Sequence, residues 1–588
     1  MPPRSSDASS NGTLTETTPL VNAKNDVQNH AIATDEPLWS RVYAEVLDQL
    51  DTALPTLQGM VFTKIPWLIS LRFVGGIGAH ELAAAALATT LCNVTGLSLS
   101  VGLSSALSTL SGQAKGELVS RMIHEKRRRV SFDLAAEESG NLIAGNNDSQ
   151  EEEEPITPIV FFWRGMVIQL SMVVPVAIWW LFGVKNVLIS LGQAERLSSM
   201  TEAYLRFLAP SLMGYSINWT LTAWLQSIGM ADVPAKASVL GLALHVPFNW
   251  FFIYFLEWGY LGCGAATVCF NVIQPLFIIS YLCLYGHGRR RLLKSSGGTA
   301  IGRTHLTFWN EFWRAVSSGR GYMQYMGLAL PGIVIISEWW ASETAIFLSG
   351  RLVPDPEVAV GGMTIYQSIN TFCFMFPLAF AISASTRVGN LLGAGQSKGA
   401  AFAAGVSILS AACLSLCMGI LLFCIPHTFL PSLFAPGADG VILETSRTIP
   451  LLATYVFADG IQVALNGIIK GCGRQLITVP IVVVAYWVVG VPLAYYIAFV
   501  RYDQEMFCED SYFCGDVGLV AGMTTGTWQV LRRLSRWDSI IFLQTNLFLL
   551  LFARFQRVHM LLLALVVGLS TDWQVEAQKA KERVADRS

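Results

Sequence analysis

Two acidic residues interrupt apolar stretches that are otherwise long enough to cross a lipid bilayer. Glu338 lies twelve residues into a segment that begins at 326, and Asp459 lies twelve residues into a segment that begins at 447. At about 1.5 Å of rise per residue, both carboxylates lie about 18 Å deep, close to the bilayer midplane. A charge at that depth costs about 2.5–3.5 kcal/mol even on the mild insertion scale, so both acids are candidate functional residues.

Buried carboxylates can exchange protons. A carboxylic acid removed from water favours its protonated form, so one or both acids could hold a proton near neutral pH and exchange it for a cationic substrate. That exchange is the minimal chemistry of a proton-coupled antiporter. The alternative is a structural ion pair with Arg387 or Lys470, or with Lys64 and Arg72 of the first apolar segment.

A third acid, Glu343, lies five residues beyond Glu338. This spacing turns it about 140° around a helix, so it cannot share one narrow face with Glu338. Glu343 is kept as a further candidate coupling residue. Nearby aromatic rings could stack on a flat cation, although such residues more often pack or anchor a helix at the membrane interface. The candidate substrate-cavity residues are Trp339, Tyr366, Gln367, Asn370 and Tyr215.

The elements that must position these residues are membrane helices. The chain has 588 residues, of which 53% are hydrophobic and only 14% charged, too few charges to solvate several soluble domains. A membrane-spanning helix needs about 20 mainly apolar residues. The candidate segments lie at 54–75, 81–105, 159–182, 204–226, 236–256, 261–285, 326–350, 361–385, 401–425, 447–470, 478–500 and from about 517.

The two halves of the chain repeat each other. GQAKG at 112–116 returns as GQSKG at 395–399, and Val246-Pro247 has a counterpart in Val491-Pro492. The first half is longer between these landmarks, and the polar stretch at about 130–157 accounts for most of the difference. The repeat predicts an all-α polytopic membrane protein with twelve transmembrane helices in two pseudo-symmetric six-helix lobes.

Basic residues collect in two loops, which predicts that both loops are cytoplasmic. The expected organisation is a disordered cytoplasmic tail at 1–36, an N-terminal lobe at 45–286 with a charged cytoplasmic loop at 115–158, a cytoplasmic linker at 287–320, a C-terminal lobe at 321–573 and a cytoplasmic tail at 574–588. The protein is expected in the plasma membrane or the vacuolar membrane.

The eleven cysteines and eight histidines show no metal-binding spacing, and no phosphate-binding loop occurs in the sequence. Neither a metal nor another cofactor is expected. Cys508 and Cys514 lie in a predicted external loop, where they could form a disulfide in an oxidising compartment. An embedded transferase would need clustered His/Asp or Ser/His groups at a membrane face, and the sequence offers none. We therefore expect a transporter and not an enzyme.

Three motifs identify a family resemblance. The segments LPGIVIISEWWASETAIFLSG at 330–350, STRVGNLLGAGQ at 385–396 and DGIQVALNGIIKGCG at 459–473 resemble the eukaryotic branch of the multidrug and toxic compound extrusion (MATE) transporters. The resemblance implies a monomer with a central cavity that exports organic cations or other amphipathic molecules, driven by protons or less often sodium. It implies no nucleic acid partner. The alternative is a flippase of a related fold for a lipid-linked substrate.

The resemblance also assigns roles. Glu338 matches the seventh-helix carboxylate of the family, Asp459 its tenth-helix acid, and Glu343 a second acid of the seventh helix. Some members carry a glutamate about where Tyr366, Gln367 and Ser368 stand, and this departure weakens a prediction of strict organic-cation selectivity.

One segment breaks the family pattern. GTWQV at 526–530 would normally continue into HMLLLALVVGLSTDW at 559–573, but 28 residues at 531–558 separate them. We interpret 531–558 as a retained intron or an erroneous gene-model segment, which sequencing of the mature transcript would test.

Overall fold

The computed structural model describes residues 37–139, 156–190, 193–296, 308–509, 511–527 and 571–585. The predicted insert at 531–558 lies outside these residues. The first half contains α2 (Leu38–Gly75), α3 (Ala79–Cys92), η1 (Asn93–Leu97), α4 (Ser98–Ser139), α5 (Pro158–Phe182), α6 (Val184–Ser190), α7 (Glu195–Ser227), α8 (Asp232–Trp250), η2 (Phe251–Phe255), α9 (Tyr260–Leu284), α10 (Gly286–Ser295) and α11 (Phe308–Ser317). The second half contains α12 (Gly319–Ser349), α13 (Pro356–Gly393), α14 (Ser397–Cys424), α15 (Phe429–Phe434), α16 (Asp439–Gly471), η3 (Gln475–Ile477), α17 (Thr478–Val482), η4 (Val483–Gly490), α18 (Val491–Tyr495), η5 (Tyr496–Arg501), α19 (Asp516–Thr527) and α21 (Trp573–Val584).

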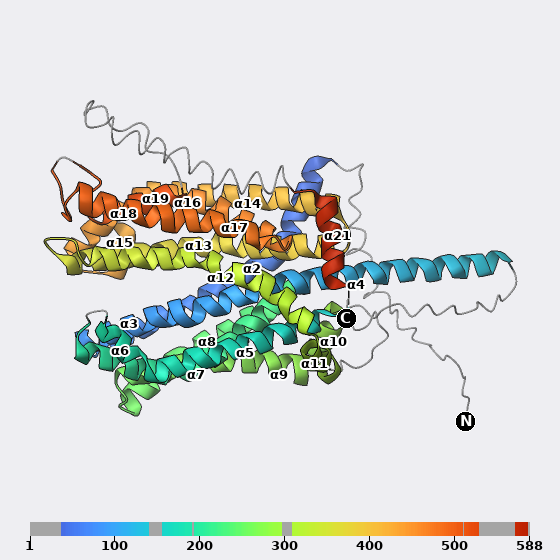
Figure 1. Cartoon of the computed structure of the whole chain (residues 1–588), viewed down its shortest axis with the longest axis horizontal. Helices are drawn as coiled ribbons and strands as arrows, with labels where there is room; N and C mark the ends of the chain where they lie inside the picture. The colour runs from blue at the N-terminus through green and yellow to red at the C-terminus, as the bar shows by residue number, and fades with distance from the viewer. Residues whose placement is uncertain are drawn as a thin grey trace, which may run out of the picture.

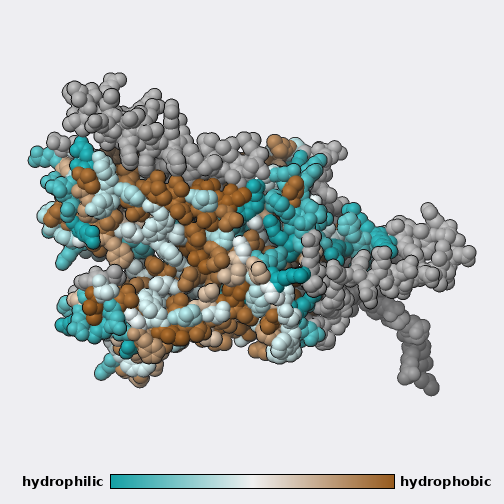
Figure 2. Space-filling model, viewed as in Figure 1, coloured by the Kyte–Doolittle hydropathy of each residue, from teal (hydrophilic) through white to brown (hydrophobic). Residues whose placement is uncertain are grey.

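Helices occupy all of the predicted spanning positions. Eight helical runs among the described residues are long and apolar enough to cross a membrane. The remaining positions are filled by α2, α7, α12 and α19, of which α19 is described only to Thr527. Figure 2 shows hydrophobic residues across the middle of the surface and hydrophilic residues towards both ends. Large side chains such as Trp250 and Phe423 are exposed in this protein, as expected for a surface that faces lipid. The all-α polytopic architecture is therefore confirmed.

The helices form two bundles that follow the internal repeat (Figure 1). In the N-terminal lobe, α7 packs along α5 and α9, and α8 packs along α2 and α9. In the C-terminal lobe, α16 lies between α13 and α14 and also contacts α19. Each lobe has its own buried apolar clusters, one of them around Leu107 and Trp224 and another around Tyr366 and Tyr486.

The predicted charged loop differs from the structure in one respect. The sequence places a loop from 115, but α4 continues as a helix to Ser139. No glycine or proline follows Gly116 until Gly140, so nothing in the sequence breaks the helix there. A pair of helical neighbours, Arg121 and Glu117, joins their side chains at 2.8 Å and supports this extension.

The two lobes meet closely at one end of the molecule. This end carries the last turns of α4 together with α10 and α21, and we call it the basic end (Figure 1). A Cβ atom at Gly393 of α13 would overlap the carbonyl oxygen of Gln113 on α4, and one at Gly116 would overlap that of Asn390. Gly116 closes the first GQxKG motif and Gly393 lies two residues before the second, and both allow helices of opposite lobes to approach backbone to backbone.

Side chains of α4 also hold the C-terminal lobe directly at the basic end. Thr109 donates a hydrogen bond of 2.7 Å to the carbonyl oxygen of Lys470, and Gln113 donates one of 3.1 Å to that of Gly471. These carbonyls belong to the last turn of α16, and that of Lys470 also accepts from the backbone N–H of Gly473 at 3.0 Å. Tyr325 of α12 donates in the other direction, to the carbonyl oxygen of Leu103 at 3.0 Å. The structure is therefore closed at the basic end.

The opposite end carries the loop between η5 and α19, and we call it the disulfide end. There Cys508 and Cys514 are joined by a disulfide, with their Cα atoms 6.0 Å apart. Arg447 of α16 fixes the loop by donating to the carbonyl oxygen of Met506 at 2.9 Å, while it also pairs with Glu444 at 2.9 Å. The helices of the two lobes diverge towards this end (Figure 1).

Candidate coupling and substrate site

The structure brings Glu338 of α12 and Asp459 of α16 together inside the C-terminal lobe. Gln462, which lies three residues beyond Asp459 on α16, donates from its Nε2 atom to Glu338 Oε2 at 3.2 Å. Asp459 is 4% exposed and accepts a hydrogen bond from the Tyr455 hydroxyl. Glu338 is half-buried, and the charge of Asp459 is close enough to act on it. The two carboxylates thus form one electrostatic unit.

Two further tyrosines complete the wall around this pair. Gln462 Nε2 also donates to the hydroxyl oxygen of Tyr486 in η4, at 3.1 Å. Tyr366 of α13 is buried and lies close enough to feel the charge of Asp459. Next to Glu338, Ser337 accepts a hydrogen bond from Trp487 Nε1 at 3.0 Å, which fixes α12 against η4. Four helical elements therefore hold the acids in place.

Arg387, one of the basic residues that could have neutralised the acids, is engaged elsewhere. Arg387 donates to both carboxylate oxygens of Glu45, at 3.0 and 2.9 Å, and to Asp48 at 2.7 Å. Within the described part of the chain, the interactions of Glu338 and Asp459 include no basic side chain. The structural ion-pair interpretation therefore has no support at these two positions.

The site also offers acceptor oxygens that are not used. The buried Oε1 atom of Gln462 and the buried Oδ1 atom of Asn370 have no hydrogen-bond partner among the described residues. Leaving a buried polar atom unpaired costs about 1–3 kcal/mol. The two carboxylates and the free oxygen of Gln462 form an environment rich in acceptors, which suits a proton, a monovalent cation or an ammonium group. Asn370 adds a further free oxygen one turn beyond Tyr366 on α13.

Glu343 does not join this cluster. It lies further along α12, and its nearest opposite charge is Lys64 of α2, in the other lobe. The turn of about 140° between Glu338 and Glu343 explains why one faces the interior of the C-terminal lobe and the other faces a different helix. The sequence suggests Lys64 as a partner for Glu338 or Asp459, whereas in the structure the charge of Lys64 acts on Glu343.

The remaining cavity candidates are divided between the lobes. Trp339 contacts the ring of Phe374 edge to face, with centroids 6.0 Å apart, and Gln367 is half-buried on α13 one residue beyond Tyr366. Tyr215 lies in the N-terminal lobe, where it stacks on Trp219 with ring centroids 5.9 Å apart. Tyr215 is therefore not part of the carboxylate cluster.

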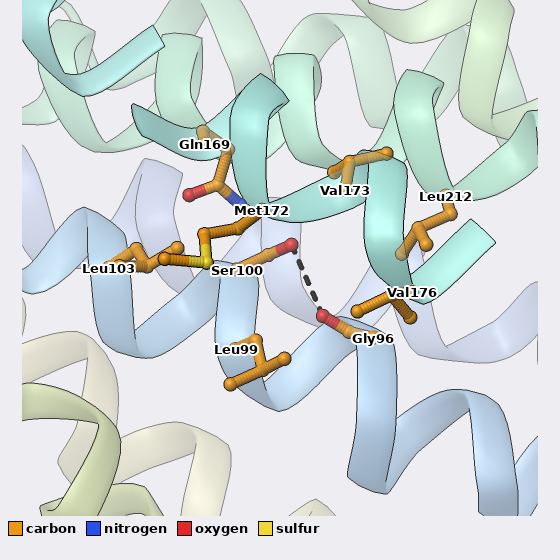
Figure 3. A pocket seen from close by; sticks show the side chains of 9 residues that line it. All are labelled: Gly96, Leu99, Ser100, Leu103, Gln169, Met172, Val173, Val176 and Leu212. Atoms are coloured by element: carbon orange, nitrogen blue, oxygen red, sulfur yellow. Dashed lines mark hydrogen bonds between the residues drawn. The ribbon is translucent and has the colours of Figure 1, made fainter. Parts of the chain in front are cut away.

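The N-terminal lobe contains a separate small pocket (Figure 3). Its lining is mostly aliphatic, with Gln169 and Ser100 as the polar side chains, and Ser100 donates to the carbonyl oxygen of Gly96 at 3.2 Å. The lining residues are Gly96, Leu99, Ser100, Leu103, Gln169, Met172, Val173, Val176 and Leu212. No acidic residue lines it, so this pocket offers no charge for a cation or an exchangeable proton. Among the described residues, no group of three or more His, Cys, Asp or Glu side chains could hold a metal ion.

Sequence reasoning missed three residues of the cluster. Tyr455 and Gln462 lie four residues before and three residues after Asp459, so helical spacing alone could have identified both. Tyr486 comes from a distant element, and its local sequence does not predict its hydrogen bond with Gln462.

Comparisons with known proteins agree with this architecture. The MatE family model matches residues 55–128, 160–251 and 332–496. Protein DETOXIFICATION 12 of Arabidopsis thaliana is 28% identical over 522 residues, which cover 88% of this chain and 87% of the relative. Multidrug and toxin extrusion protein 1 of Danio rerio is 26% identical over 451 residues, which cover 76% of this chain and 66% of the relative.

Solved structures share the fold. The crystal structure of the eukaryotic MATE transporter AtDTX14 superposes with a TM-score of 0.71 at 23% identity, and the match covers 92% of this chain and all of that chain. An outward-facing MATE family transporter of the MOP superfamily gives a TM-score of 0.63 at 17% identity. The family match spans more than half of the sequence, and it agrees with two repeated helical lobes and with the motifs that carry Glu338 and Asp459. The chain therefore belongs to the MATE family of multidrug and toxin extrusion transporters.

Proposed function

We propose that this protein is a secondary active exporter that exchanges protons for organic cations or other amphipathic small molecules. The observation that carries the proposal is the pair of Glu338 and Asp459. Glu338 accepts a hydrogen bond from Gln462 of α16 and lies within reach of the charge of Asp459, and neither acid has a basic partner among the described residues. Two like charges removed from water repel each other, so at least one must be neutralised. A proton and a substrate cation can each do this, and they compete for the same negative charge.

This competition is the physical basis of exchange. When a cation enters the cluster, its charge replaces that of the proton, and the proton is free to leave. When the cation leaves, the carboxylates regain a proton before the empty transporter returns. The acceptor oxygens of Gln462 and Asn370 add ligands for an ammonium group or for sodium, so the coupling ion has to be decided by measurement.

The direction of transport follows from the two ends of the molecule. We assign the basic end to the cytoplasm, because basic residues such as Arg289, Arg290 and Arg291 gather there. Because the basic end is closed, the conformation described here faces away from the cytoplasm. In this conformation substrate leaves and a proton enters. One chain supplies both lobes and the whole carboxylate cluster, so we propose that the transporter works as a monomer.

The test is transport of a fluorescent organic cation in proteoliposomes under an imposed pH gradient. Glu338→Gln and Asp459→Asn remove the charges with little change in shape, and Glu357→Gln at an exposed position of α13 is the matched control. The proposal expects gradient-driven transport in the parent and the control, and loss of transport in both cluster variants. Transport that is driven by a sodium gradient and not by a pH gradient would identify sodium as the coupling ion. Unchanged transport by Glu338→Gln or Asp459→Asn would contradict the assigned site.

A further inference from the structure

The C-terminal helix α21 is built to dock on the transporter. It begins with a capped turn, because the Asp572 side chain accepts hydrogen bonds from the backbone N–H groups of Gln574 and Val575, at 3.0 and 3.2 Å. Ala577, Ala580 and Val584 follow at spacings of three and four residues and are all buried. A helix of 12 residues is marginal in water, so it is this buried face that holds α21 in place.

This helix lies across the junction of the two lobes. It contacts α4 of the N-terminal lobe and also α13 and α14 of the C-terminal lobe. Ala577 and Ala580 belong to an apolar cluster of the C-terminal lobe, whereas Val584 belongs to the cluster that includes Leu103 and Leu107 of α4. Figure 1 shows α21 across the basic end, transverse to the long helices. One short helix thus packs into both lobes at once.

Arg583 extends the row of contacts that closes the basic end. Its guanidinium donates to the carbonyl oxygen of Cys472 at 2.9 Å and to that of Gly473 at 3.4 Å. The two preceding carbonyls, of Lys470 and Gly471, accept from α4. The four successive carbonyls from Lys470 to Gly473, at and just beyond the end of α16, therefore accept hydrogen bonds from other helices, two from α4 and two from α21. A cation at a helix C-terminus also complements the negative end of the helix dipole.

A buried acid positions this arginine. Glu576 is 3% exposed and lies 3.8 Å from Arg583, 3.8 Å from Arg474 and 3.2 Å from Lys579. Arg474 follows directly after the α16 turn, so Glu576 ties α21 to the same segment that Arg583 holds. The backbone oxygen of Arg583 in turn accepts a hydrogen bond from Gln324 of α12 at 2.9 Å.

We propose that α21 is a clamp that keeps the basic end closed. Because α21 contacts α4 as well as α13 and α14, the lobes cannot separate at this end unless α21 loses its contacts with one lobe. The clamp acts on the end of α16, about three turns beyond Asp459. Under the proposed function, a shift of α16 on proton or substrate exchange would reach Arg583 directly. The clamp itself does not depend on what is transported.

The test is a distance measurement across the basic end, on the full chain in lipid nanodiscs. Spin labels at Arg290→Cys on α10 and Lys398→Cys on α14 lie at exposed positions of opposite lobes. The exposed free cysteines would first be replaced by alanine; they are Cys283, Cys413, Cys417 and Cys424. Arg583→Ala removes both hydrogen bonds to the carbonyls of Cys472 and Gly473 just beyond α16. Gln578→Ala on the exposed face of α21 is the control.

The clamp predicts that Arg583→Ala raises the ratio of the long-distance population to the short-distance population about tenfold or more, since hydrogen bonds from a charged donor are lost. Val584→Ser weakens only the apolar contact and should also raise the ratio of long-distance to short-distance populations. If Arg583→Ala fails to fold, Val584→Ser provides the test of the clamp. Folded variants with the distance distribution of Gln578→Ala would overturn the proposal. This readout does not involve substrate, so it stands or falls separately from the transport assay.

Discussion

Gly393→Ala places a methyl group where the two lobes are closest. In the closed state, this methyl would overlap the carbonyl oxygen of Gln113 and would lie 2.8 Å from the carbonyl carbon and the Cα atom of the same residue. All three are backbone atoms inside α4, so they cannot rotate away as a side chain could. The end of α13 and the middle of α4 must therefore separate, and this separation opposes closure of the basic end.

The size of the effect follows from the nature of the contact. Inserting a methyl group into a packed interface costs about 1–3 kcal/mol. The clash exists only while the basic end is closed, so the whole penalty should act on the equilibrium between the two conformations. A penalty of that size changes the ratio of open to closed molecules by about 5- to 150-fold.

Accessibility of a buried cysteine measures this ratio. Ser108 of α4 lies one turn from Ser105 and one turn from Gly112, is 8% exposed, and uses its hydroxyl only within its own helix. In a background without other exposed cysteines, Ser108→Cys should react with a membrane-impermeant maleimide only when the basic end opens.

The control variant is Gly327→Ala, because a Cβ atom at Gly327 meets nothing within 4 Å. We expect Gly393→Ala to speed labelling of the cysteine at position 108 from the basic side by at least about fivefold over this control. A folded Gly393→Ala protein that labels at the rate of the control would refute the argument that backbone contact closes this end.

Three further variants probe the contacts around the site and the lobe junction. Tyr455→Phe removes the hydroxyl that donates to Asp459, so Asp459 should lose about 1–3 kcal/mol of hydrogen-bond stabilisation. We expect slower gradient-driven transport, and an unchanged transport rate would contradict this. For Lys64 and Glu343, single and double glutamine variants should give a coupling of about 0.5–3 kcal/mol in thermal unfolding, whereas simple additivity would mean that the two charges do not interact. Arg387→Ala breaks hydrogen bonds of 2.7–3.0 Å to two acids of α2 and should destabilise the detergent-solubilised protein by about 1–3 kcal/mol; an unchanged melting temperature would argue against an anchoring role for this contact.

Most of the architecture could be predicted from the sequence, because lipid imposes a simple requirement on length and polarity. Each apolar segment became a helix, and the repeated GQxKG motifs marked two lobes that make backbone contacts at Gly116 and at Gly393, two residues before the second motif. The main miss, the continuation of α4 to Ser139, arose because polarity was taken as the sign of a loop. A polar helix that leaves the membrane keeps its backbone hydrogen bonds as long as no glycine or proline interrupts it.

The site could be predicted only in part. Depth in the membrane placed Glu338 and Asp459 at one level, and the structure brings them into one cluster. Tyr486 could not be foreseen, since its contact depends on how η4 packs against α16. The carbonyls at the end of α16 were equally invisible, because backbone atoms are the same at every position and only the fold decides which of them are left unpaired.

Proton release on substrate binding tests the central claim most directly. Addition of an organic cation to the purified protein in weak buffer, followed with a pH-sensitive dye, reports whether the cation displaces protons. The account predicts that binding acidifies the solution and that the double variant Glu338→Gln with Asp459→Asn releases no protons. Saturable binding of the cation to the parent protein without any proton release would contradict it.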